Sequence, residues 1–175
     1  FSSATSRQLI ITVAASAPTL YYNCSVHSGM GGQINTNTGH GSSNFDGSIQ
    51  SRVSHNPLTG FSLVQYTVPS SGDFTFGHGL GAEPAAVFLR GGYATSSFNT
   101  DVFHHRLSNN GIGVRLTLNT SDQEANAPKA FKSGTNSSVI EQQYDWYGSG
   151  EVNIAYCFTE KRGFSSFGDW TGNGF

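Results

Sequence analysis

The sequence predicts an all-β fold, an antiparallel β-sandwich-like domain, and three observations support this prediction. Glycine occupies 22 of the 175 positions, aromatic residues make up 13% of the chain, and charged residues make up only 11%. This mixture is typical of turn-dense β structure rather than of a helical bundle. Short apolar runs recur between turn residues. One of them, Val114–Leu118, alternates apolar and polar residues, which predicts one buried and one solvated face with Leu118 on the buried side.

The expected elements follow the chain in order. The first strand is Leu9–Val13, and the second runs through Leu20–Tyr22 after Pro18. Later strands are expected at Phe61–Val68, Phe74–Phe76, Ala86–Leu89, Val114–Leu118 and Val152–Phe158. The one helix candidate is the capping-box pattern Ser121–Glu124, which Pro128 would end after about two turns.

The composition also predicts how the chain is divided. Between Gly29 and about Gly47 nearly all residues are Gly, Ser, Asn or Thr, which indicates a linker or a long surface loop. We therefore expect the end of a smaller β module at residues 1–38, a linker at 39–47 and a sandwich-like domain at 48–162. Residues 163–175 are expected to begin a following unit, because Gly163-Phe164-Ser165 repeats the Gly60-Phe61-Ser62 that opens an earlier strand.

Charge and hydropathy argue against two classes of partner. The formal net charge is -2, and the few Lys and Arg residues are scattered, so no basic stripe is present to neutralise nucleic-acid phosphates. No stretch approaches the roughly 18 consecutive apolar residues that a membrane-spanning helix needs. We expect neither nucleic-acid binding nor membrane insertion.

The sharpest chemical motif is Cys24-x-x-His27-x-x-Met30. Type 1 copper sites take a thiolate, an imidazole and a weak axial thioether from such a loop after a strand. They also need a second imidazole, and residues 1–23 contain no His, whereas His40 and His55 lie downstream. Cys24, His27 and Met30 are thus an incomplete candidate metal site, and we predict no resident cofactor unless a further His is supplied. The alternative is a packed loop with a buried Cys and Met.

Other motifs are interpreted as structural. His104-His105 beside Asp101 suggests a metal or proton-transfer pair, but adjacent residues on a strand point to opposite faces, which favours a surface or edge position. Gly77–Gly81 resembles a phosphate loop, yet no helix follows, so a tight turn with a structural His78 is expected. Cys157 is expected to be a buried thiol in a central strand.

The pattern of ionisable residues predicts a protein that is not an enzyme. No Ser, His and acid combination carries a nucleophile elbow, and the Glu residues show no pairing suited to acid and base catalysis. No residue is therefore predicted to be catalytic.

Two stretches resemble parts of known phage proteins. Residues 11–32, ITVAASAPTLYYNCSVHSGMGG, resemble the last two strands of a cupredoxin-like module from structural proteins of marine phages, chiefly cyanophages. Within residues 45–175, six segments resemble the signatures of a β-rich repeat of unknown biochemical function from the same phage proteins. They are Phe45–Ser51, Gly60–Val64, Gly77–Gly81, Ile154–Phe158, Gly163–Gly168 and Trp170–Gly174. The resemblance supplies no catalytic residue.

The resemblance implies a structural component of a phage virion appendage, a tail or head fibre made in the host cytoplasm. Its implied partners are other virion proteins and sister chains. A more specific implied role is binding of a host-surface glycan or receptor. We expect a homotrimer. Loops Tyr93–Asn99 and Tyr144–Tyr147 carry aromatic and amide groups suited to sugars or to sister chains. The alternatives are a copper-binding electron-transfer module and a glycan-cleaving depolymerase, which needs a spaced carboxylate pair.

Overall fold

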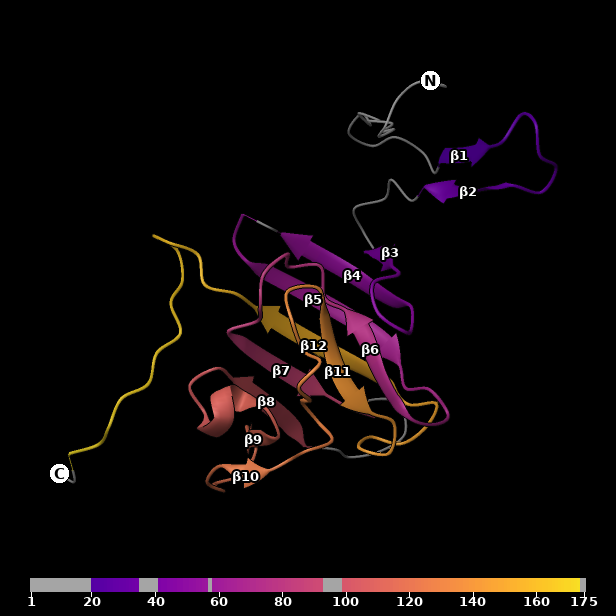
Figure 1. The fold of residues 1–175 in the computed structure, drawn as a ribbon. Helices are drawn as coiled ribbons and strands as arrows, with labels where there is room; N and C mark the ends of the chain where they lie inside the picture. The colour runs from indigo at the N-terminus through magenta and orange to yellow at the C-terminus, as the bar shows by residue number, and fades with distance from the viewer. Residues whose placement is uncertain (1–19, 35–40, 57, 93–98, 174–175) are drawn as a thin grey trace. The chain divides into compact units, whose positions relative to one another are not determined.

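The computed structural model describes residues 20–34, 41–56, 58–92 and 99–173. The chain divides into two compact units, residues 1–40 and 41–175. In the first unit, β1 (Leu20–Asn23) and β2 (Gly31–Ile34) pair as an antiparallel hairpin (Figure 1). The predicted strand Leu9–Val13 lies outside the described residues.

The second unit is built on an antiparallel sheet of eight strands in the order β10-β9-β8-β7-β12-β5-β4-β3. These strands are β3 (Ser42–Asn44), β4 (Ser51–Asn56), β5 (Phe61–Thr67), β7 (Ala86–Arg90), β8 (Thr100–His104), β9 (Val114–Thr117), β10 (Ala125–Asn126) and β12 (Val152–Phe158). Two further strands, β6 (Asp73–Gly77) and β11 (Val139–Gln143), pair with each other and form a second layer across the sheet (Figure 1).

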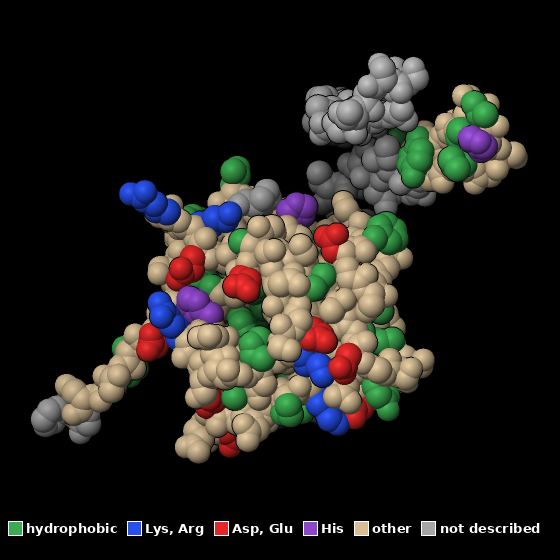
Figure 2. All heavy atoms as spheres, viewed as in Figure 1, with side chains coloured by type: hydrophobic (Ala, Val, Ile, Leu, Met, Phe, Trp, Pro, Cys, Tyr) green, Lys and Arg blue, Asp and Glu red, His purple; other side chains and the backbone are tan. Residues whose placement is uncertain are grey.

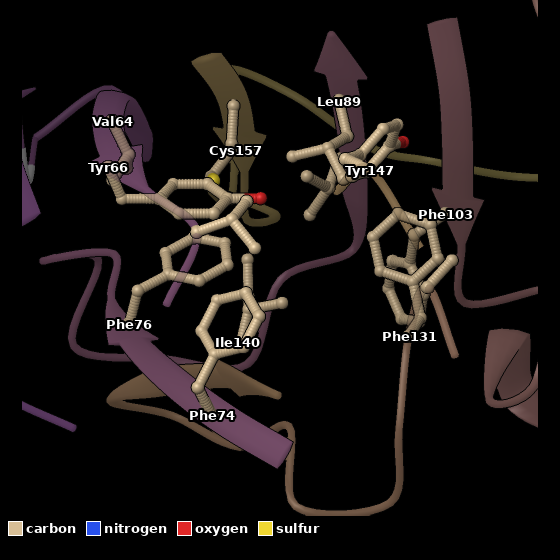
Figure 3. Close-up of a cluster of buried hydrophobic side chains, with 14 of the residues drawn as sticks. Val64, Tyr66, Phe74, Phe76, Leu89, Phe103, Phe131, Ile140, Tyr147 and Cys157 are labelled. Atoms are coloured by element: carbon tan, nitrogen blue, oxygen red, sulfur yellow. The ribbon is translucent and has the colours of Figure 1, made fainter. Parts of the chain in front are cut away.

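The second layer covers one face of the sheet and creates the core. Val64, Ala155 and Leu89 lie directly opposite one another on β5, β12 and β7, and all three are fully buried. Phe76 and Ile140 from the second layer belong to the same buried cluster (Figure 3). Burial of such side chains stabilises the fold by about 1.5–3 kcal/mol each. The predicted all-β, sandwich-like architecture is therefore confirmed.

Several predicted elements differ in detail. The Gly-, Ser-, Asn- and Thr-rich stretch from Gly29 to Gly47 contains β2 and β3, which pair with β1 and β4, and β3 lies within the expected linker 39–47. No α-helix forms at Ser121–Glu124, because the Glu124 carboxylate that a capping box requires accepts the backbone N–H of Ser108 (3.0 Å) instead. In the described residues the helical content is one 3-10 turn, η1 (Ser108–Gly111). No described helix is long and apolar enough to cross a membrane.

The predicted alternation along β9 is wrong at two positions. Leu118 was expected to be buried but is 65% exposed, because the strand ends at Thr117. Thr117 was expected to be solvated but is buried, because it lies opposite Asp101 on the covered face of the sheet. The side chain buried at each position therefore depends on which face the second layer covers and on where the strand ends, not on residue polarity.

Candidate functional site

The predicted metal ligands lie on the loop of the β1–β2 hairpin. Cys24 directly follows β1 and Met30 directly precedes β2, so strand pairing brings the two ends of the loop together. The backbone N–H of Cys24 donates to the Met30 carbonyl at 2.7 Å. Within the loop, Cys24 Sγ lies 3.4 Å from His27 Nδ1.

The thiol and the imidazole are close enough to share one metal ion. Bonds of about 2.3 Å to sulfur and about 2.0 Å to nitrogen at a tetrahedral angle place the two donor atoms about 3.5 Å apart. Backbone N–H groups of Val26 and His27 lower the pKa of the Cys24 thiol, which favours the metal-binding thiolate. Met30 is 59% exposed rather than packed. The loop thus fits a soft metal ion through two donors, with an accessible thioether.

The second imidazole of a type 1 site is not supplied by the described part of the first unit, where His27 is the one histidine. His40 lies outside the described residues, and His55 lies on β4 in the second unit. Among the described residues, no three His, Cys, Asp or Glu side chains are grouped so as to hold a metal ion.

The His104-His105 pair does not form a site with Asp101. The prediction that the two imidazoles point to opposite faces is wrong, because β8 ends at His104 and the chain turns, leaving their ring centroids 5.2 Å apart. The N–H of Arg106 donates to His104 Nδ1 at 3.1 Å. His105 Nε2 donates to the carbonyl of Phe167 at 2.8 Å and so fastens the C-terminal segment to the domain.

His78, in the Gly77–Gly81 turn, is buried and fully hydrogen-bonded. Its Nε2–H donates to the Asn136 carbonyl (3.0 Å), and its Nδ1 accepts the N–H of Leu80 (3.2 Å). Burial lowers the pKa of the imidazole, which favours the neutral form that these two bonds require. The interpretation of His78 as a structural residue is confirmed.

Asp101 is buried and bound by three side chains, an arrangement that the sequence did not predict. Its Oδ2 accepts Trp146 Nε1–H at 2.7 Å and the Tyr147 hydroxyl at 2.5 Å. Its Oδ1 pairs with the Arg115 guanidinium, which also lies 5.1 Å from the Trp146 ring centroid. The partners are 14 to 46 residues away in sequence, so no local signal reveals the cluster. Gly91 leaves room for the Tyr147 ring, which a Cβ would overlap.

This cluster corrects the prediction of exposed sugar contacts at Tyr144–Tyr147. Tyr147 is buried, and Tyr144 and Trp146 are half-buried and pack against the core. Trp146 Nε1–H and the Tyr147 hydroxyl hold Asp101 rather than facing solvent as a platform. Of the other predicted loop, residues 93–98 lie outside the described part.

The open face of the sheet carries an apolar band, which we call the outer band. It takes one residue from each of β5, β12, β7, β8 and β9, each directly opposite the next: Leu63, Tyr156, Phe88, Val102 and Leu116. Leu63 is 37% exposed and Tyr156 is 42% exposed. Phe88 and Leu116 are half-buried and Val102 is buried, so the exposed part of the outer band is its Leu63 and Tyr156 end. Exposed apolar side chains that lie side by side in this way mark interaction sites in soluble proteins.

The other side of the molecule has a different character. Figure 2 shows the side on which β6 and β11 lie, where polar and backbone atoms dominate and charged side chains are scattered. Several charges are paired there or elsewhere on the surface, including Lys132 with Asp73 (2.9 Å) and Lys129 with Asp145 (2.6 Å). Exposed pairs of this kind contribute about 0–1 kcal/mol each.

Comparison with known proteins identifies one family. The model of DUF7483, a domain of unknown function, matches residues 34–175, which include the whole second unit. No curated protein and no solved structure matches the chain.

Proposed function

We propose that this chain, which belongs to the DUF7483 family of domains of unknown function, is a structural module of a phage virion appendage that assembles with sister chains through the outer band. The observation that carries the proposal is the continuous row of apolar side chains across five adjacent strands on the open face. The virion setting rests on the resemblance of residues 45–175 to a repeat of phage structural proteins.

The chain already covers one end of the open face with its own aromatic side chains. Phe158, next to Tyr156 in the outer band, lies 5.1 Å from Phe61 and 5.9 Å from Phe167 of the C-terminal segment, between ring centroids. The open face is thus suited to apolar packing. A homotrimer closed about an axis buries the remaining band equally in each chain and leaves the outward surfaces free for host contact.

Sedimentation velocity or mass photometry of the intact chain at micromolar concentration tests this proposal. We expect a trimer for the wild type and a monomer for Leu63→Asp and for Tyr156→Asp, because a carboxylate in the contact loses its hydration without gaining a partner. Leu58→Asp is the matched control, because Leu58 is an exposed leucine in the turn between β4 and β5. A monomeric wild type, or a trimer that tolerates both band substitutions, contradicts the proposal.

A second candidate function is copper binding at the hairpin loop, favoured by the 3.4 Å separation of Cys24 Sγ and His27 Nδ1. Thiolate and thioether ligands select Cu(I). The chain's Cys24, His27 and Met30 would hold the ion, whose contribution is either stabilisation of the loop or, with a further imidazole, electron transfer.

Competition of the chain with a chromophoric Cu(I) chelator tests this second candidate. We expect one equivalent of Cu(I) per chain, lost in Cys24→Ser and retained in the control Ser25→Ala. Because the described part of the first unit supplies no second imidazole, Cu(II) addition is expected to give no intense blue band. Equal Cu(I) uptake by the wild type and by Cys24→Ser would remove this candidate.

A further inference from the structure

A cleft of about 610 Å³ opens beside the η1 turn and contains chemistry that neither the core nor the outer band uses. Buried Pro84 and Phe103 and half-buried Ile112 supply its apolar lining, and half-buried His105 and Thr135 add polar groups. Exposed polar side chains line its mouth: Glu83, Arg106, Asn109, Asn110 and Ser133. Its volume lies in the range of about 300–1,000 Å³ that small-molecule sites occupy.

The backbone at the mouth is held in an uncommon conformation. Asn109, Asn110 and Gly111 have φ values of 51°, 54° and 81°, three left-handed residues in succession. A non-glycine residue pays about 1–2 kcal/mol for this region, although asparagine tolerates it better than most. The Asn109 side-chain amide donates to the Ile112 carbonyl at 3.0 Å and holds the turn. Asn110 is therefore presented at the cleft on a fixed backbone.

Three polar side chains at the mouth are available to a ligand. Within the described part of the chain, Glu83, Asn110 and Ser133 have no hydrogen-bond partner for their side chains. They come from three separate segments: the loop before β7, the η1 turn and the loop before β11. A ligand in the cleft thus meets preformed polar groups from three sides, which limits the entropy lost on binding.

The donor and acceptor types at the mouth narrow the ligand class. A carboxylate only accepts hydrogen bonds, a guanidinium only donates them, and amide and hydroxyl groups do both. Adjacent hydroxyl groups on a sugar ring also donate and accept at once, and the C–H face of the ring suits the apolar side chains in the lining. The cleft is lined by one carboxylate, Glu83, one guanidinium, Arg106, and the His105 imidazole, whose Nε2–H donates to the Phe167 carbonyl. Arg106 also lies 3.9 Å from Asp169, so the lining has no strong positive excess for an anion.

We infer that this cleft binds a neutral saccharide, with Glu83 and Asn110 accepting and donating hydrogen bonds at its hydroxyl groups. The inference rests on the proposed function for its biological setting, since it names the ligand class for contact with a host surface. Binding itself is measurable whether or not the chain assembles.

Saturation-transfer difference NMR on the intact chain tests the inference. The neutral probes are D-glucose, D-galactose, D-mannose and N-acetyl-D-glucosamine, and the anionic probes are D-glucuronic acid and glucose 6-phosphate. We expect transfer to at least one neutral probe and less transfer to its anionic counterpart. Absence of transfer to every neutral probe, or preference for the anionic ones, overturns the inference.

Two variants test whether the saccharide binds at the cleft. Asn110→Gly removes the amide while permitting the left-handed backbone, and Glu83→Gln removes the charge with little change of shape. Each should weaken binding at least about tenfold, as expected for loss of hydrogen bonds to a charged or preorganised group. Asp46→Asn, an exposed acid outside the cleft, is the control. Wild-type affinity in both cleft variants would contradict the assignment.

The outcomes for this inference and for the proposed function are distinguishable. Sugar binding that survives in the monomeric Leu63→Asp variant supports the cleft independently of assembly. A wild-type trimer that binds none of the neutral probes overturns the cleft and leaves the assembly role standing. A monomeric wild type that binds a neutral sugar supports the cleft and contradicts the assembly role.

Discussion

The two faces of the eight-stranded sheet do not separate apolar from polar residues in the usual way. On the covered face, Val64, Ala155, Leu89 and Asp101 lie opposite one another across four adjacent strands, and all are buried. On the open face, the neighbouring residues of the same strands form the apolar outer band. A carboxylate is therefore buried under the second layer, whereas Leu63 and Tyr156 face outward.

Hydrogen bonding explains why the covered face accepts polar residues. The Tyr66 hydroxyl donates to Gln142 and accepts Asn153 Nδ2–H at 3.2 Å, and Asn153 Oδ1 accepts the N–H of Gly92 at 3.0 Å. Burial raises the pKa of the Tyr66 phenol. Buried polar groups are tolerated when they are paired in this way. Residue polarity alone therefore does not determine which face of this sheet is covered.

The largest expected effect is the protection of the thiol on the covered face, compared with the thiol of the hairpin loop. Cys157 is fully buried on the covered face, where desolvation raises the pKa of its thiol to about 12. In Cys24→Ser, alkylation of Cys157 by iodoacetamide should require unfolding and be slowed by the full unfolding equilibrium, about 10³-fold or more. In Cys157→Ser, the more accessible Cys24 should react at once. Comparable rates for both thiols in the native chain would refute the buried assignment.

Truncation on the covered face should be costly. Phe76→Ala removes a fully buried ring that stacks on Tyr66 with centroids 3.9 Å apart, and should lower the free energy of unfolding by about 3–5 kcal/mol. Phe45→Ala, at an exposed phenylalanine, should change it by about 0.5 kcal/mol or less. Urea denaturation of both variants measures the difference, and similar midpoints would contradict the core assignment.

The Asp101 cluster should be the next most sensitive feature. Asp101→Asn keeps the shape but turns an amide NH₂ toward donors from Arg115, Trp146 or Tyr147, leaving a buried donor unsatisfied. We expect a loss of about 1–3 kcal/mol of unfolding free energy. Asp122→Asn, on the exposed segment after β9, is the control. Trp146 fluorescence should also change in Asp101→Asn but not in the control.

The smallest expected effect concerns the open face in the unassembled chain. Leu63→Ala removes a side chain whose main partner is the opposing Tyr156, and should cost less than about 1 kcal/mol. Leu89→Ala, two strands away on the covered face, should cost about 2–5 kcal/mol. Thermal unfolding of dilute, monomeric samples makes the comparison. Equal losses would mean that both faces are covered within one chain.

Sequence predicted the strands whose residues are mostly apolar or aromatic. β5, β6, β7 and β12 were located within a residue or two of their bounds, and Cys157 was correctly expected to be buried. β4, β8 and β11 were missed, because SRVSHN, TDVFH and VIEQQ mix polar residues with apolar ones. Gln142 and Asp101 fit inside only because their partners come from distant segments, which no local pattern records.

The candidate sites also differ in whether they are built from neighbouring or from distant residues of the sequence. The motif Cys24-x-x-His27-x-x-Met30 is local, so sequence located it, and a hairpin could be expected to gather it. The outer band and the cleft are built from strands and loops far apart in the chain, so neither has a signature in sequence.

By itself, then, the sequence determined that the chain is β-rich, where its most apolar strands lie and which loop carries soft metal donors, because these depend on neighbouring residues. Tertiary structure alone decided which face of the sheet β6 and β11 cover. Strand alternation places residues on two faces but does not distinguish them, and here both faces are apolar enough to be buried. The choice came from the hydrogen-bond partners that the second layer and its loops bring to Asp101, Tyr66 and Asn153.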